Sequence, residues 1–120
     1  MGGYRNKILE VDLSNSKMDL TDISGDDKKR FIGGSGVAAK LFLDCFNINA
    51  DPLSPDNPLI VMNGPLTGTT LPGTSRFAVC GKSPLTDIWG EGTCGGNFGP
   101  ELKFAGMDGI IFKGVAPTPV

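Results

Sequence analysis

The 120-residue chain contains no histidine, and this absence narrows the chemistry that the chain can carry out alone. Histidine is the commonest general base and a frequent metal ligand. Its absence excludes Ser/His/Asp and Cys/His catalysis and histidine-ligated zinc within these residues. Because the chain has so few catalytic groups, we expect a protein that positions a ligand and does not itself react with it.

Cysteine is scarce as well. Cys45, Cys80 and Cys94 stand far apart and form no Cys-x-x-Cys pair. An odd number of dispersed cysteines argues against a disulfide framework and against a self-contained zinc site. Because a lone cysteine is most often a small buried hydrophobe, we interpret Cys94 as structural.

Strong charge and long apolar runs are also missing. The formal net charge is −2 at pH 7 and the isoelectric point is about 4.9, so no nucleic-acid or anionic membrane surface is predicted. No run of 18 apolar residues occurs, and the opening MGGYRNKILEVD is too polar for a signal peptide. We therefore expect a cytoplasmic protein, with room for one small domain over residues 1–120.

Hydrophobic periodicity and turn residues predict a mixed α+β fold. Strands are expected at 5–13, 17–22, 59–62, 76–81, 86–93 and 109–113, and helices at 25–32, 35–46 and 100–105. Most connections are too short for helical crossovers. The pairing of the strands should therefore be mostly antiparallel or mixed.

Particular residues sharpen this prediction. Ser24 and Asp27 have the spacing of a capping box at the start of the first helix. Pro100 suits the first position of the last helix. In the second strand, Met18 and Leu20 alternate with polar residues, which predicts that both face the core.

Two glycine motifs resemble a dinucleotide fingerprint but stand in the wrong context. GEGTCG at 90–95 is not followed directly by a helix, and GSGVAA at 34–39 follows a charged helix instead of a strand. A Rossmann site needs a strand before the motif and a helix after it. These motifs therefore predict no such site.

The stretch 64–106 is dense in glycine and proline yet keeps good strand formers, which indicates ordered backbone with tight turns. Its window 90–99 holds five glycines, at positions 90, 92, 95, 96 and 99. Glycines allow the main chain to approach a flat or anionic ligand closely. They also form bulges and tight turns at the rim of a sheet, and the sequence leaves both interpretations open.

Arg76 ends a Gly/Pro/Thr/Ser loop and is the first residue of the strand predicted at 76–81. A guanidinium held there could bind a phosphate through two parallel hydrogen bonds. The alternative is a surface arginine that pairs with Glu91 or Asp87.

Four motifs, in this order along the chain, resemble the N-terminal region of the aldehyde ferredoxin oxidoreductase family. The members of this family are pterin enzymes that contain tungsten or, in some cases, molybdenum. The motifs are GPLTGT at 64–69, GTSR at 73–76, KSPLT at 82–86 and CGGNFGPELKFAGMDG at 94–109. The resemblance extends back through DPLSPDNPLI at 51–60 and GGSGVAAKLFL at 33–43, and so covers essentially the whole chain.

The resemblance implies a cofactor site. In the family, two molybdopterins hold tungsten and a magnesium ion links their phosphates. By motif, Arg76 would contact the pterin and Gly95 would contact it through its backbone. A third contact falls at Thr93, where relatives have asparagine; a main-chain carbonyl contact to the magnesium would survive that difference. No catalytic residue and no metal-ligating side chain is predicted here, and the ligands of the family's [4Fe-4S] cluster lie beyond this span.

The resemblance also implies a place in a larger molecule. The chain would be a β-α-β unit, the first half of a duplicated N-terminal domain, and two copies could pair as a homodimer. The implied activity is oxidation of an aldehyde to a carboxylic acid with ferredoxin as electron acceptor. The alternative is a non-catalytic pterin-binding, phosphate-binding or dimerisation module. The identity of the aldehyde, and tungsten against molybdenum, stay open.

Overall fold

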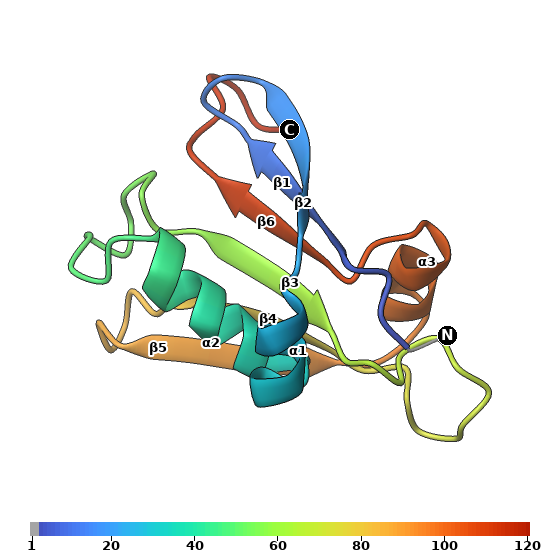
Figure 1. Cartoon of the computed structure of the whole chain (residues 1–120). Helices are drawn as coiled ribbons and strands as arrows, with labels where there is room; N and C mark the ends of the chain where they lie inside the picture. The colour runs from blue at the N-terminus through green and yellow to red at the C-terminus, as the bar shows by residue number, and fades with distance from the viewer. Residues whose placement is uncertain (1–2) are drawn as a thin grey trace.

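A six-stranded sheet in the order β2-β1-β6-β3-β4-β5 organises the chain (Figure 1). The computed structural model describes residues 3–120. The strands are β1 (Lys7–Asp12), β2 (Lys17–Asp22), β3 (Leu59–Asn63), β4 (Phe77–Lys82), β5 (Trp89–Cys94) and β6 (Gly109–Lys113). The helices are α1 (Gly25–Phe31), α2 (Gly34–Cys45) and α3 (Phe98–Phe104). Neighbouring strands pair antiparallel except β1 and β6, which are parallel, so the predicted mixed α+β class is confirmed.

The boundaries differ from the predicted ones mainly in two places. β5 begins at Trp89 instead of residue 86, because a turn precedes it in which Asp87 has a φ of 59° and its N–H bonds the carbonyl of Ser83 over 2.8 Å. α3 begins at Phe98, so Pro100 is its third residue and not its first. Proline is tolerated there because the first-turn N–H groups have no partner inside the helix.

Helix α1 begins as the sequence predicts. The Oγ of Ser24 accepts a hydrogen bond from the N–H of Asp27 over 3.0 Å. This bond satisfies one of the free donors in the first helical turn. The capping-box prediction is confirmed in that respect.

Helix α2 packs against one face of the sheet at β3 and β4, and α1 packs against α2 (Figure 1). The core forms between α2 and the sheet. Val37, Ala38 and Phe42 of α2 are buried there. The sheet contributes the buried residues Ile8, Ile60, Met62, Ala78, Cys80 and Ile111. Cys45, the last residue of α2, is exposed.

The other face of the sheet is apolar but has no helix layer over it among the described residues. Directly paired residues project from the same side of a sheet. The register therefore places one set of residues on this open sheet face: Leu9, Val11, Met18, Leu20, Leu59, Val61, Phe77, Val79, Ile110 and Phe112. Met18 is 71% exposed and Leu20 is 58% exposed, so the prediction that they face the core was wrong. They pair with Val11 and Leu9 on the uncovered side of the edge strand β2.

Candidate functional site

Two of the three predicted site residues touch each other at one corner of the sheet. Arg76 directly precedes β4, and Thr93 is the fifth residue of β5, the strand paired with it. The Nη1 of Arg76 donates a hydrogen bond to the Oγ1 of Thr93 over 3.1 Å, and both residues are exposed. The structure thus brings the two together with the guanidinium facing outward.

The carboxylates proposed as alternative partners of Arg76 are engaged elsewhere. Glu91 accepts a hydrogen bond from the Nε1 of Trp89 over 3.0 Å. Asp87 forms an ion pair with Lys82, with 2.9 Å between the Oδ1 and Nζ atoms. The interpretation of Arg76 as half of a surface ion pair with either residue was therefore wrong. Its charge stays available to an anion.

The buried hydroxyl of Thr67 forms a hydrogen bond with the main chain of Arg76. The Oγ1 of Thr67 donates to the carbonyl oxygen of Arg76 over 3.0 Å and accepts a hydrogen bond from the N–H of Gly64 over 3.2 Å. Thr67 is only 5% exposed. Sequence reasoning did not single out Thr67, although its place inside GPLTGT was the available signal.

The five glycines of the window 90–99 divide into two groups. Gly96 has a φ of 89°, which favours glycine over any residue with a side chain, and Gly99 and Gly90 have neighbours within 3.4 Å of a built Cβ. Gly92 and Gly95 have neither a positive φ nor a tight neighbour. A Cβ on Gly92 would meet nothing within 4 Å, and one on Gly95 would meet only the Oγ of Ser75, at 3.9 Å.

This division separates the two interpretations of the glycines. Turns and packing account for Gly90, Gly96 and Gly99. They do not account for Gly92 and Gly95. Gly95, two residues after Thr93, leaves open space near Ser75 and Arg76 at the exposed end of β5, whereas Gly92 pairs with Val79 and opens onto the other side of the sheet. A group that lies flat against the main chain would fit the space at Gly95, since a side chain at this position would lift it away.

Cys94 and Phe98 border the same corner. Cys94 is exposed, because it pairs with Phe77 on the open sheet face of the edge strand β5. Phe98 is 49% exposed and packs against Phe77, with 5.1 Å between the ring centroids. This aromatic pair therefore lies at the corner on the open sheet face, on the side of β5 opposite Thr93.

Asn63 was also missed, because the predicted strand ended one residue earlier. Its Nδ2 donates to the carbonyl oxygen of Gly99 over 3.0 Å, which fastens the start of α3 to the end of β3. Asn63 is 2% exposed, and its Oδ1 has no hydrogen-bond partner among the described residues. The signal in the sequence was a polar residue ending the apolar run LIVM.

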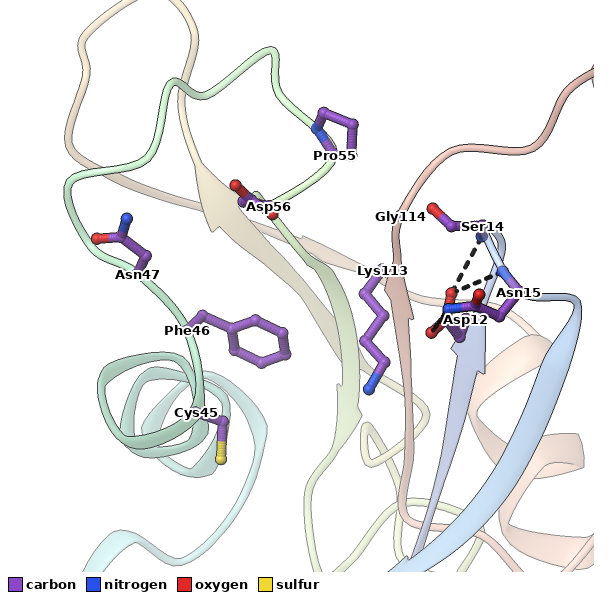
Figure 2. Close-up of a pocket in the computed structure, with 10 residues that line it drawn as sticks. All are labelled: Asp12, Ser14, Asn15, Cys45, Phe46, Asn47, Pro55, Asp56, Lys113 and Gly114. Atoms are coloured by element: carbon purple, nitrogen blue, oxygen red, sulfur yellow. Dashed lines mark hydrogen bonds between the residues drawn. The ribbon is translucent and has the colours of Figure 1, made fainter.

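A separate hollow of about 320 Å³ lies at the opposite end of the strands, between the end of α2 and the ends of β1 and β6 (Figure 2). Asp12 accepts hydrogen bonds there from the side chain and backbone of Asn15 and the backbone of Ser14, which lower the pKa of its carboxyl group. A hydrogen bond to Glu10 raises the pKa of Lys113. These charged groups are satisfied within the chain, and Arg76, Thr93 and Gly95 do not line this hollow.

Neither place has the composition of a metal centre. Within residues 3–120, no cluster of three or more histidine, cysteine, aspartate or glutamate side chains is arranged to hold a metal ion. The corner around Arg76 instead offers one cation, one hydroxyl and bare main chain. That donor set suits an anionic, flat organic group.

Comparison with known proteins decides the family. The family described as "Aldehyde ferredoxin oxidoreductase, N-terminal domain" matches residues 8–120. The chain belongs to this family. The resemblance seen in the sequence motifs is thereby confirmed.

Curated relatives support the assignment along the whole chain. The tungsten-containing aldehyde ferredoxin oxidoreductase of Pyrococcus furiosus is 41% identical over 120 residues, which is 100% of this chain and 20% of that protein. The enzyme of the same description from Pyrococcus horikoshii is 42% identical over the same shares. The chain therefore spans about one fifth of the length of these relatives.

A solved structure shows the same fold. The active-site complex BamBC of benzoyl coenzyme A reductase, in complex with 1,5-dienoyl-CoA, matches this N-terminal domain with a TM-score of 0.94 and 36% sequence identity. The match covers 98% of this chain and 18% of that chain. Among residues 3–120 of this family member, no helix has the length and apolar character needed to cross a membrane.

Proposed function

We propose that this chain is the cofactor-binding N-terminal segment of a tungstopterin oxidoreductase that oxidises aldehydes to carboxylic acids. The observation that carries the proposal is the bare main chain at Gly95, near an exposed arginine whose charge no carboxylate of the described chain neutralises. The unit, a domain or half-domain spanning residues 1–120, and a cytoplasmic location belong to the same proposal.

Each residue at this corner has a distinct task. Arg76 binds a pterin phosphate, because a guanidinium remains charged and matches phosphate oxygens with two donors. Thr93 orients that guanidinium through its hydroxyl. Gly95 would bring its backbone against the pterin, and the main-chain carbonyl of Thr93 would contact the magnesium ion.

The redox chemistry belongs to the cofactor. When bound, a tungsten or molybdenum bis-molybdopterin supplies the two-electron chemistry that converts an aldehyde and water to a carboxylic acid and two protons. We propose that the electrons leave through a [4Fe-4S] cluster, ligated outside this span, to ferredoxin. The residues of this chain bind and orient the pterin and take no part in a covalent step.

The decisive experiment compares two arginine variants of the protein purified with its cofactor. Arg76→Gln should lower the pterin and tungsten content per protein at least tenfold, because it removes a charge-assisted phosphate contact. Arg30→Gln is the matched control, since that exposed side chain pairs with Asp26 on α1 and lies in a different part of the fold. Equal pterin and metal content in both variants would refute the function.

The open sheet face supports a second proposal, that the isolated 120-residue chain associates as a homodimer. Exposed apolar surface beside an edge strand promotes pairing with another chain. Light scattering over a dilution series should show a dimer for the unmodified chain. Leu20→Lys should shift the chain to monomer, because it places a charge in the middle of the exposed edge. A well-folded monomer at all concentrations of the unmodified chain would exclude the homodimer.

A further inference from the structure

Thr67 is buried beneath the candidate site, and both its hydroxyl and its methyl group contact neighbouring residues. Its Oγ1 accepts the N–H of Gly64 and donates to the carbonyl oxygen of Arg76, over 3.2 Å and 3.0 Å. Its methyl carbon Cγ2 lies 3.0 Å from the position that a Cβ on Gly99 would take. One side chain thus touches the loop before Arg76, the main chain of Arg76 and the first turn of α3.

The position of Arg76 makes the hydroxyl contact consequential. The first residue of β4 that pairs with β5 is Phe77, whose partner is Cys94, so Arg76 lies one residue outside the ladder. The bond from Thr67 fixes the carbonyl of Arg76 at this point, where regular strand pairing does not. The backbone conformation of a residue limits the rotamers of its side chain. Fixing the main chain of Arg76 therefore limits the orientations of its guanidinium.

The other surroundings of Thr67 are closely packed. Asn63 is buried at the end of β3 and holds the carbonyl oxygen of Gly99 over 3.0 Å. The built Cβ of Gly99 would also approach the carbonyl oxygen of Ser75 to 3.1 Å, which shows how closely α3 fits against the loop before Arg76. Thr67 therefore links the closely packed contact between β3 and α3 to the main chain of Arg76, which carries the exposed guanidinium.

We propose that Thr67 is a positioning residue, whose buried hydroxyl holds the main chain of Arg76 so that the guanidinium rests on Thr93 in the orientation that receives the anionic pterin. The inference rests on the proposed function, because it needs Arg76 to bind the cofactor. Preorganisation of this kind strengthens binding by removing the cost of ordering the side chain when the ligand arrives.

Threonine allows its two groups to be removed separately. Thr67→Val keeps the methyl contact with α3 and removes the hydroxyl, whereas Thr67→Ser keeps the hydroxyl and removes the methyl group. The measurement is the rate at which pterin leaves the purified, cofactor-loaded protein during dialysis, followed by the fluorescence of oxidised pterin in the dialysate. We expect release about tenfold faster for Thr67→Val, the effect of one lost hydrogen bond, and within about twofold of wild type for Thr67→Ser.

A double variant separates positioning from general destabilisation. If Thr67 acts through Arg76, adding Thr67→Val to Arg76→Gln should accelerate release no further, because the group being positioned is already absent. Equal acceleration in both backgrounds would show a purely structural role and overturn the inference. Unchanged release in Arg76→Gln alone would overturn the proposed function instead.

The serine variant keeps the test decisive if the valine variant does not fold. A folded Thr67→Ser protein that releases pterin tenfold faster than wild type would overturn the inference, since its hydroxyl is intact. Wild-type release from Thr67→Ser, together with fast release from a folded Thr67→Ala protein, would support it. Thermal unfolding of the cofactor-free variants supplies the check on folding.

Discussion

Lys103 of α3 and Asp108, which directly precedes β6, form an ion pair whose side chains are 3% and 2% exposed. The Nζ of Lys103 also donates to the carbonyl oxygen of Gly3 over 2.6 Å. The Oδ2 of Asp108 accepts the N–H groups of Arg5 and Asn6 over 2.8 Å and 2.7 Å. The pair thus ties the segment before β1 to the helix that follows the glycine-rich stretch.

Breaking this pair should destabilise the protein strongly. Asp108→Asn keeps the shape of the side chain but leaves the ammonium of Lys103 buried without its counter-charge, which costs about 3 kcal/mol or more of the free energy of unfolding. Asp22→Asn is the control, because Asp22 pairs with Lys7 at the surface with its side chain 71% exposed. Its loss should cost at most about 1 kcal/mol. Urea unfolding of both variants tests the difference, and equal midpoints would contradict it.

A methyl group at position 99 should disturb the packing of α3. In Gly99→Ala the added Cβ would lie 2.9 Å from the Oδ1 of Asn63 and 3.0 Å from the Cγ2 of Thr67. Such overpacking costs about 1–3 kcal/mol. Gly92→Ala meets nothing within 4 Å and should leave the stability of the cofactor-free protein within about 1 kcal/mol of wild type. Thermal unfolding measures the stability of both variants. A similar loss of stability in both would show that the close contacts at Gly99 do not determine the effect of the added methyl group.

The three cysteines should differ in reactivity and in its pH dependence. The thiolate is the reactive form of cysteine. Burial raises the pKa of Cys80 to about 11, and Cys80 is 1% exposed, so it should resist iodoacetamide at pH 8. Cys45 is exposed as a residue, but partial desolvation of its thiol also raises its pKa, so its alkylation should accelerate as the pH rises above 8. The exposed Cys94 should be modified first.

Mass spectrometry of the folded 120-residue chain, alkylated at pH 8 and at pH 10, locates the modified cysteines. A denatured sample, in which all three thiols are accessible, supplies the control for intrinsic reactivity. Modification of Cys80 as fast as Cys94 in the folded chain would contradict the packing of β4 against α2.

The sequence predicted the elements better than the faces they present. Alternation identified β2 but could not distinguish its two sides, because the pattern of Met18 and Leu20 is the same whether a helix layer covers them or not. The register places both on the face opposite α1 and α2. The start of β5 was misplaced for a local reason: Asp87 adopts a positive φ, which residue type alone does not reveal.

The candidate site shows a similar division. Motif resemblance identified Arg76, Thr93 and Gly95, and the structure adds that Arg76 bonds Thr93. The supporting residues Asn63 and Thr67 were not predicted from the sequence, because their roles depend on hydrogen bonds to residues 36 and 9 positions away in the chain. No local pattern encodes such contacts, whereas exposed motif residues can be recognised from their order alone.

The position of β6 between β1 and β3 has a consequence for how the chain acquires its structure. The hairpin β1–β2 and the antiparallel run β3–β4–β5 each pair with sequence neighbours and can form early. Their hydrogen-bonded connection runs through Gly109–Lys113, close to the end of the 120 residues. On the ribosome, where synthesis proceeds from the N-terminus, the two halves of the sheet must wait for this last strand before they join. We therefore expect the corner that carries Arg76 to assemble before the sheet closes.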